Sequence, residues 1–305
     1  VPGCYQDLEQ ADLLILTGSN LAWCHPVLYQ RVLAAKKARP QMKVIVIDPR
    51  RTATCEIADL HLAIKPASDS FLFNGLLNWL HQQGKTDTRF VAQHCEGLQQ
   101  ALQSAQWYAP SSALVAEHCG LSNESVATFF HWFANNTKTV TVYSQGINQS
   151  SSGSDKVNAI INCHLLTGRI GKPAMGPFSI TGQPNAMGGR EVGALSNQLA
   201  AHMDFDQDLH IDLVERFWQA ERMARQPGLK ALDLFDAINQ GKIRAIWIIA
   251  TNLAVSMPDA TKVRHALQNC ELVVVSDCIR HTDTTRYADI LLPALGWGEK
   301  TGTVT

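Results

Sequence analysis

The chain has 305 residues, 46% of them hydrophobic, and its 26 basic residues are balanced by 27 acidic ones. This length is ordinary for two domains with a sizeable buried core, so we expect a globular α/β protein. The balanced charge gives no net positive potential that would attract nucleic acid or an anionic membrane. No apolar run reaches the roughly 18 residues of a membrane-spanning helix. We therefore expect neither nucleic acid nor a membrane as a partner, and a cytoplasmic location.

The first elements alternate between strand and helix. Residues 12–17 and 43–47 are apolar runs typical of buried strands, and residues 25–38 between them have a helical pattern that ends before Pro40. This β-α-β order predicts parallel strands.

A longer helical region follows the second strand. Ser68 and Asp69 are expected to cap a helix that ends at Gly84. Residues 86–135 have mostly helical patterns, and residues 139–143 return as a strand.

The second half of the chain contains a glycine-rich segment and another α/β unit. Residues 171–193 include six glycines and three prolines and are expected to form a loop. We expect a domain boundary between Gly189 and Asp204, which gives a first domain of residues 1–195 and a second of residues 196–305. The other predicted elements are helices over 153–168, 192–202 and 258–268, an acidic stretch over 204–212, and strands over 245–250, 272–276 and 289–292.

Parts of the first unit recur in the second. Residues 13–26 (LLILTGSNLAWCHP) are similar to residues 246–258 (IWIIATNLAVSMP), and residues 44–64 are similar to residues 273–294, with offsets of 229 to 232 positions. Two matches in the same order at nearly constant spacing indicate an internal duplication. We therefore predict two related Rossmann-like αβα domains with mainly parallel sheets, and two related ligand sites.

Small polar residues follow most of the predicted strands. Ligands of parallel α/β proteins bind at the carboxyl ends of the strands, where backbone amides and helix N-termini favour phosphate groups, and a carboxylate there suits a ribose hydroxyl or a guanine N–H. Each residue taken singly could be only a turn residue, but the set favours a nucleotide-type ligand. No G-x-G-x-x-G follows the first strand, which argues against NAD. The set is Gly18, Ser19, Asn20, Asp48, Pro49, Arg50, Ser144, Gln145, Gly146, Thr251, Asn252, Ser276 and Asp277.

The segment over residues 181–193 (TGQPNAMGGREVG) has little apolar surface to bury, and its glycines permit close backbone approach. We predict a loop shaped around a ligand. Arg190 is expected to bind an oxyanion through two hydrogen bonds from its planar guanidinium, or else to form a surface salt bridge with a carboxylate such as Glu191. Met187 is a candidate pocket residue or core filler, and Gln183 a candidate contact to a heterocycle or within the loop.

The remaining polar features are less specific. The loop over residues 146–153 could cradle an anion or cap the helix that follows it. The eight cysteines form no Cys-x-x-Cys pair, so these residues give no support for a zinc or cluster site. Most of them are expected to be buried or incidental thiols in a reducing compartment, and we predict no metal ligand within the chain.

Six motifs taken together resemble the molybdopterin oxidoreductases of the dimethyl sulfoxide reductase superfamily. Two of them, GINQSSSG at residues 146–153 and GQPNAMGGREVG at residues 182–193, are most similar to the catalytic subunit of assimilatory nitrate reductases. The resemblance implies a molybdenum ion held by two molybdopterin guanine dinucleotides, and two dinucleotides on two related domains would account for the repeat. The other four motifs are G-S-N-x-A-x-x-H-P, I-D-P-R-R-T-x-T, A-D-L-H-L and P-x-x-D, at residues 18–26, 47–54, 58–62 and 66–69.

By motif position, the resemblance implies roles for individual residues. Arg190 and Met187 would be the catalytic residues, with Arg190 attracting and orienting nitrate. The first dinucleotide would be held by Gly18, Ser19, Asn20, Asp48, Arg50, Ser68 and Asp69, and the second by Thr251, Asn252, Ser276, Asp277 and Thr282. Further cofactor contacts, in loops that approach the pterins and the metal, would come from Gly146, Asn148, Gln149, Gly182 and Gln183.

The resemblance also implies parts outside these residues. A [4Fe–4S] cluster and a cysteine ligand of molybdenum are expected upstream of Val1, because the context of Cys4 does not fit that ligand, and a closing domain is expected after Thr305. The chain is thus expected to be a central fragment, inactive alone, of an enzyme that reduces nitrate to nitrite by oxygen-atom transfer, with electrons from a donor protein or domain. The alternatives are a formate dehydrogenase of the same superfamily, a non-catalytic electron-transfer or scaffold homologue, and a duplicated nicotinamide dehydrogenase.

Overall fold

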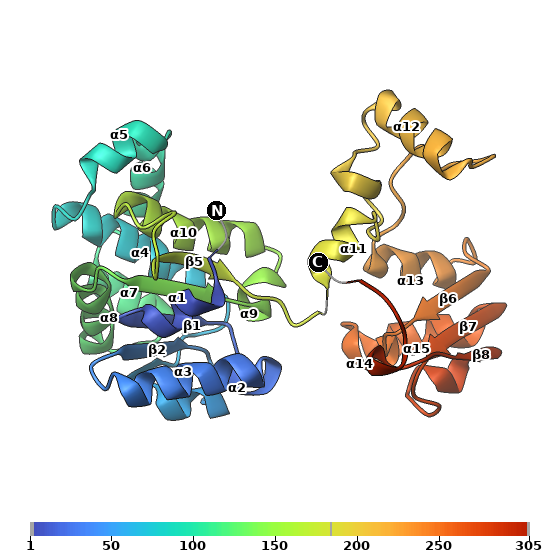
Figure 1. The fold of residues 1–305 in the computed structure, drawn as a ribbon, viewed down its shortest axis with the longest axis horizontal. Helices are drawn as coiled ribbons and strands as arrows, with labels where there is room; N and C mark the ends of the chain where they lie inside the picture. Colours follow the sequence, from blue (N-terminus) through green and yellow to red (C-terminus); the bar gives the residue numbers. More distant parts are fainter. Residues whose placement is uncertain (1–2, 184, 304–305) are drawn as a thin grey trace. The chain divides into compact units, whose positions relative to one another are not determined.

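The computed structural model describes residues 3–183 and 185–303. The chain folds into two compact units, residues 1–184 and 185–305, and each has its own parallel sheet (Figure 1). The mainly parallel α/β fold predicted from the sequence is confirmed. The two units meet between residues 184 and 185, inside the glycine-rich segment and before the predicted limit between residues 195 and 196. The limits of the dinucleotide-binding domains stay a prediction.

A five-stranded sheet organises the first unit, and every neighbouring pair of its strands is parallel. The strand order is β3 (Leu60–Leu62), β2 (Lys43–Ile47), β1 (Leu13–Thr17), β4 (Thr139–Tyr143) and β5 (Gly176–Ser179). Every residue of β1 and β4 is buried, as expected for strands that are covered on both faces. Because Thr17 pairs with Ile47 on one side and Tyr143 on the other, the carboxyl ends of three strands reach the same edge.

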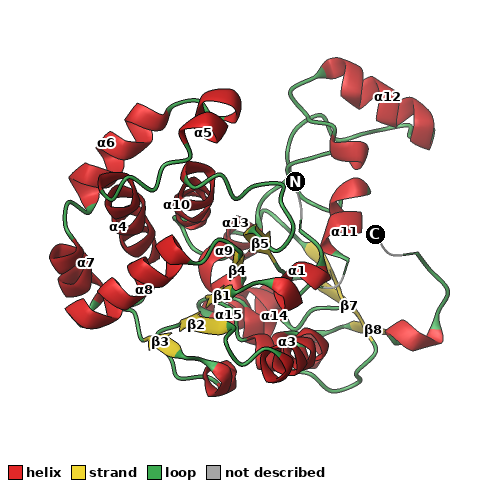
Figure 2. Ribbon diagram, turned by 60° about the vertical axis from the view of Figure 1, so that its left-hand side comes forward, coloured by secondary structure: helices red, strands yellow, loops and turns green. Residues whose placement is uncertain are grey.

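Helices cover both faces of this sheet (Figures 1 and 2). The core on one face includes Phe73, Phe129 and Phe133, and the core on the other includes Leu14 and Val44. The first face is covered by α4 (Asp69–Gln82), α6 (Leu98–Tyr108), α7 (Ser112–Cys119), α8 (Asn123–Asn135) and α10 (Gly153–Leu166), with α5 (Thr88–His94) before α6. The second is covered by α1 (Tyr5–Gln10), α2 (Leu21–Cys24) and α3 (Pro26–Ala38).

Three details of the first unit differ from the predictions. β5 lies inside the segment predicted as a loop; Pro177 interrupts its pattern and is tolerated because β5 is an edge strand. The turn after β4 is a short helix, α9 (Gln145–Asn148). Ser68 occupies the N-cap of α4, but its hydroxyl donates to the carbonyl of Lys65 at 2.6 Å and accepts no bond from a helix amide.

The N-terminal helix is anchored by a buried carboxylate. Asp7 accepts hydrogen bonds from the amides of Cys4 and Ala174, each at 2.7 Å, and so ties α1 to the loop before β5. Burial by itself raises the pKa of Asp7, but these hydrogen bonds outweigh it, and the pKa is lowered overall. The ionised carboxylate therefore stabilises this part of the fold.

The second unit contains a three-stranded parallel sheet in the order β6 (Ala245–Ile249), β7 (Leu272–Asp277) and β8 (Ile290–Pro293). α13 (Ala231–Asn239) and α15 (Ala260–Asn269) pack together with the sheet around Phe235 and Val275, whereas Trp247 on β6 is exposed. The remaining helices are α11 (Ala186–Glu191), α12 (Asp208–Trp218) and α14 (Leu253–Ser256), with a 3-10 turn at Trp297–Glu299.

The helix predicted over residues 192–202 is wrong. α11 ends at Glu191, and only a 3-10 turn forms at Ala200–His202, where Ala201 has a left-handed φ of +55°. Within the described ranges of both units, every helix is too short or too polar to cross a membrane.

The duplication predicted from the sequence is present in the fold. The order β1, α2, α3, β2, a 3-10 turn (Ala53–Ile57) and β3 is repeated as β6, α14, α15, β7, a 3-10 turn (Thr285–Tyr287) and β8. Gly18 and Ala250 follow the first strand of each unit, and both have a φ of +55°. The Gly18 amide donates to Ile47 at 3.0 Å and the Ala250 amide to Ser276 at 2.9 Å. The repeat therefore extends to the backbone at the strand ends.

Candidate functional site

The strand-end edge of the first unit is built on a close approach of two glycines. The amide of Gly146 donates to the carbonyl of Gly18 at 3.0 Å. A Cβ on Gly18 would lie 2.8 Å from the carbonyl carbon of Gly146, and a Cβ on Gly146 would lie 2.6 Å from the Cα of Gly18. The backbone itself therefore requires both glycines, whatever ligand this edge binds.

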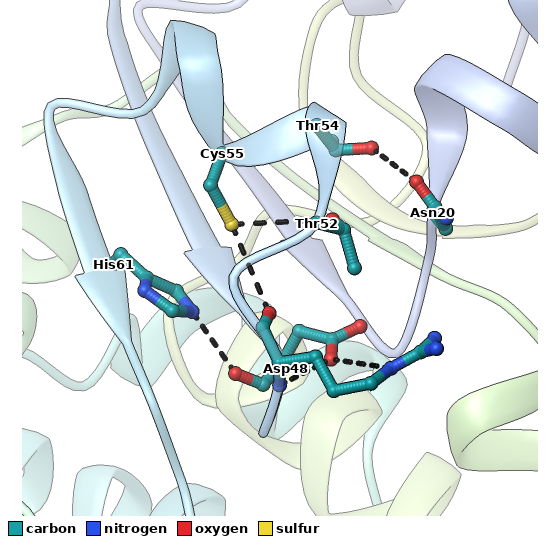
Figure 3. Close-up of polar contacts among 7 residues, drawn as sticks. Asn20, Asp48, Thr52, Thr54, Cys55 and His61 are labelled. Atoms are coloured by element: carbon teal, nitrogen blue, oxygen red, sulfur yellow. Dashed lines mark hydrogen bonds and ion pairs between the residues drawn. The ribbon is translucent and has the colours of Figure 1, made fainter.

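A buried threonine holds the turn after β1. The hydroxyl of Thr54 donates to Asn20 Oδ1 at 3.0 Å (Figure 3). It also accepts from the amide of Ala22 at 3.1 Å. The second unit repeats this arrangement, because the hydroxyl of Thr284 donates to Asn252 Oδ1 at 2.7 Å and accepts from the amide of residue 254 at 3.0 Å. Both threonines are fully buried. The paired segments of the sequence already aligned these threonines, yet sequence reasoning gave them no role.

A carboxylate follows the second strand of each unit. Asp48 Oδ1 accepts from the amide of Arg50 at 2.8 Å, and Asp277 Oδ1 accepts from the amide of Ile279 at 2.9 Å. In the first unit, His61 Nε2 also donates to the carbonyl of Asp48 at 3.0 Å (Figure 3). Within the described residues, Oδ2 of each aspartate has no hydrogen-bond partner. These oxygens are therefore available to accept an O–H or N–H from a ligand.

Other hydrogen-bonding capacity at the first edge is also unused. Ser19 is 2% exposed, and its hydroxyl has no partner among the described residues; the same is true of the buried Thr17 hydroxyl. Buried hydroxyls are normally paired. The Arg50 side chain is largely exposed, 4.0 Å from Asp48. These polar groups fit a ligand that contains phosphate and ribose, such as a dinucleotide.

Ser68 and Asp69 lie after β3, at the start of α4. Asp69 Oδ2 forms an ion pair with Lys156 Nζ at 2.8 Å, and both side chains are buried. Neither this partner nor the Ser68–Lys65 bond was predicted.

A polar cluster joins α9 to the segment after β5. Gln145 Nε2 donates to Thr181 Oγ1 at 2.9 Å and to Gln183 Oε1 at 2.7 Å. His25 Nε2 donates to the carbonyl of Thr181 at 2.8 Å. A Cβ on Gly182 would meet no atom within 4 Å, so the protein's own packing does not require a glycine there. Among the loop residues predicted nearby, Asn148 is half-buried and Gln149 is exposed.

The two residues predicted to be catalytic lie on α11 in the second unit. Met187 is 66% exposed, so it does not fill the core. Arg190 is exposed, and its guanidinium forms no ion pair with a carboxylate in residues 3–183 or 185–303. The Arg190 carbonyl accepts from Gln198 Nε2 at 2.7 Å, which ties the helix to the segment that follows it.

The other residues predicted for the second dinucleotide also gather at the ends of β6 and β7. Thr251 is exposed after β6. Ser276 Oγ accepts from Trp247 Nε1 at 2.9 Å, and the Thr282 amide donates to Thr285 Oγ1 at 2.7 Å. Thr251, Asn252, Ser276 and Asp277 therefore lie at the carboxyl ends of β6 and β7.

The cysteines are free thiols. Cys55, Cys119 and Cys163 are buried, and burial raises the pKa of Cys119 to about 11. Cys4 and Cys24 are exposed. In the part of the chain that the structure describes, no group of three or more His, Cys, Asp or Glu residues is placed to hold a metal ion.

The fold and these edges define a class of protein. Two parallel α/β units, related by duplication, each present an asparagine–threonine pair and a partly unsatisfied aspartate at the carboxyl ends of their strands. In parallel α/β folds of the Rossmann-like class, the carboxyl ends of the strands are where ligands bind.

The sequence matches the molybdopterin oxidoreductase family over residues 4–305, and the chain belongs to this family. Over its whole length it is 53% identical to a nitrate reductase of Klebsiella oxytoca and 51% identical to one of Shewanella frigidimarina. It covers 34% and 32% of those proteins, and so spans about a third of the length of these relatives.

More distant proteins share the fold. The F420-dependent formate dehydrogenase subunit alpha of Methanocaldococcus jannaschii is 32% identical over 98% of this chain and 43% of that protein. The solved structure of acetylene hydratase from Pelobacter acetylenicus has a TM-score of 0.69 at 21% identity, over 98% of this chain and 42% of that one. At 21% identity, the similarity to acetylene hydratase supports the fold alone.

Proposed function

We propose that this chain is the cofactor-holding part of a molybdenum-dependent nitrate reductase, with one molybdopterin guanine dinucleotide on the strand-end edge of each unit. The observation that carries the proposal is the repeated pair of sites, Asn20 with Thr54 and Asn252 with Thr284, each beside a partly unsatisfied aspartate. Family membership supports molybdopterin as the cofactor. Identity above 50% to two nitrate reductases supports nitrate as the substrate.

The proposed contacts follow from the chemistry of the two edges. Asp48 and Asp277 would accept hydrogen bonds from ribose hydroxyls or guanine N–H groups through their unused oxygens. Backbone amides would donate hydrogen bonds to the phosphate groups. The first dinucleotide would be held by Gly18, Ser19, Asn20, Asp48, Arg50, Ser68 and Asp69, and the second by Thr251, Asn252, Ser276, Asp277 and Thr282. Gly146, Asn148, Gln149, Gly182 and Gln183 would complete the cofactor contacts.

When bound, the molybdenum cofactor would supply two-electron oxygen-atom transfer, which converts nitrate to nitrite. This chain would bind and orient the reactants. The exposed Arg190 guanidinium has the planar fork that matches two oxygens of planar nitrate, and no described carboxylate neutralises it. Met187, on the same short helix, would shape the approach to the metal.

Further parts of the proposal concern the whole protein. We propose a [4Fe–4S] cluster in its N-terminal region, an electron-donor protein or domain as partner, and a cytoplasmic location. Residues 1–195 and 196–305 would be the two dinucleotide-binding domains.

The proposal is tested with Arg190→Leu in the holoenzyme, assayed for nitrate reduction with a reduced dye. We expect nitrate turnover to fall about 100-fold, the usual effect of removing one donor to a developing anion, with molybdenum content unchanged. Arg222→Leu, at another exposed arginine of the second unit, is the control and should keep full turnover. Unchanged turnover in Arg190→Leu would refute the proposed role of Arg190. Formate oxidation without nitrate reduction by the wild-type holoenzyme would show that the substrate is formate and not nitrate.

A further inference from the structure

The first unit contains one deeply buried ion pair that the proposed contacts do not explain. Lys156 Nζ lies 2.8 Å from Asp69 Oδ2, and the two side chains are 3% and 10% exposed. Among the ion pairs of the described residues, it is the one in which both side chains are this deeply buried.

The pair lies beside the strand-end edge. Asp69 is the first residue of α4, which follows β3, and Lys156 is in the first turn of α10, which follows β4 and α9. In a parallel sheet, the helix that follows a strand begins near that strand's carboxyl end. The helices α4 and α10 pack against each other (Figure 2), so the pair joins the two helix starts at the edge where the ligand is proposed.

A buried ion pair is by itself weak evidence of a contribution to fold stability. Taking two charges out of water opposes folding, and apolar side chains of similar volume often replace a buried ion pair without loss of stability. The interface already has an apolar core that includes Phe73, Leu76 and Ile160. A buried pair at this position is therefore better explained by what the carboxylate does at the edge.

We infer that Lys156 is a positioning residue for the nucleotide. It holds Asp69 through Oδ2, while Oδ1, which has no hydrogen-bond partner among the described residues, accepts an N–H or O–H from the nucleotide half of the dinucleotide. This inference rests on the proposed function. It adds to that function a residue of α10 that is outside the proposed set of cofactor contacts.

The test compares holoenzyme variants at a temperature well below their unfolding midpoints. Lys156→Met removes the ammonium and leaves Asp69 in place, and the double variant Lys156→Met/Asp69→Asn removes both charges. Guanine nucleotide retained per folded chain after dilution and the unfolding midpoint are measured for each. Lys262→Met, which breaks the exposed ion pair with Asp236 in the second unit, is the matched control.

A positioning role predicts that nucleotide dissociates about ten-fold faster from Lys156→Met, because a hydrogen bond to a well-placed carboxylate is lost. The double variant should recover the unfolding midpoint but not the retention, and Lys262→Met should behave as the wild type. If Lys156→Met does not fold, Lys156→Gln replaces it, and faster nucleotide loss than from the wild type is again the expected result. Recovery of both properties in the double variant, or normal retention in Lys156→Met, would make the pair a structural clamp and overturn the inference. A wild-type enzyme without guanine nucleotide would instead overturn the proposed function itself.

Discussion

Thr54→Val tests whether the repeated threonine holds the strand-end turn. Valine has nearly the same shape but removes a hydroxyl that donates to Asn20 at 3.0 Å and accepts from Ala22 at 3.1 Å. Thr54 is fully buried, so water cannot replace the hydroxyl without a rearrangement. Each lost hydrogen bond contributes about 0.5–1.5 kcal/mol net, so we expect a loss of about 1–3 kcal/mol in the free energy of unfolding.

Thermal or denaturant unfolding of the first unit measures this effect, and each kcal/mol should lower the unfolding midpoint by about 2–4 °C. Thr52→Val is the matched control, because among the described residues the Thr52 hydroxyl has one hydrogen-bond partner, Cys55 Sγ at 4.0 Å, and we expect a change within about 0.5 kcal/mol. Thr284→Val should repeat the Thr54→Val effect in the second unit, where the same bonds are 2.7 and 3.0 Å long. Equal stability of the Thr54→Val and Thr52→Val proteins would show that the Thr54 hydroxyl does not hold the turn.

Three further outcomes are expected. Ala250→Gly should stabilise the second unit by about 0.5–1 kcal/mol because glycine adopts the left-handed φ of this position without strain. Gly18→Ala should strongly destabilise the first unit because the added Cβ would lie 2.8 Å from backbone atoms, and similar effects of the two changes would contradict this. The lowered pKa of Asp7 stabilises the native state above the ordinary aspartate pKa of about 4, and this contribution is lost as the pH falls through the lowered value. The free energy of unfolding should therefore fall less steeply with decreasing pH in Asp7→Asn than in the wild type, and identical slopes would exclude a stabilising role for the Asp7 carboxylate. A thiol reagent at neutral pH should label Cys24 rapidly and Cys119 only on unfolding, and equal labelling rates would count against the burial of Cys119.

Sequence pattern predicted the central strands because β1 and β2 are nearly continuous apolar runs and β4 consists of β-branched residues and a tyrosine. All three strands begin and end within a residue of their predicted limits. β5 was missed because Pro177 and a neighbouring glycine hide its pattern. The helix over residues 192–202 was wrong because Gly193 at its start and Ala201 and His202 at its end have positive φ, which local helix propensity does not register.

The site was predictable where it repeats and unpredictable where it depends on packing. Asn20, Asp48 and their counterparts were recognised from the duplicated segments. Thr54 was in the same alignment but was given no role, because burial of its side chain is a property of the fold. The Asp69–Lys156 pair joins two helices that are far apart in sequence, and no periodicity relates them.

We propose that each of the two duplicated strand-end edges holds one dinucleotide of the molybdenum cofactor. The most direct measurement is the amount of guanine nucleotide and molybdenum released per chain from the holoenzyme purified under reducing conditions. We expect about two guanine nucleotides and one molybdenum per chain, one nucleotide for each duplicated strand-end edge. A single nucleotide, or molybdenum without guanine, would contradict it.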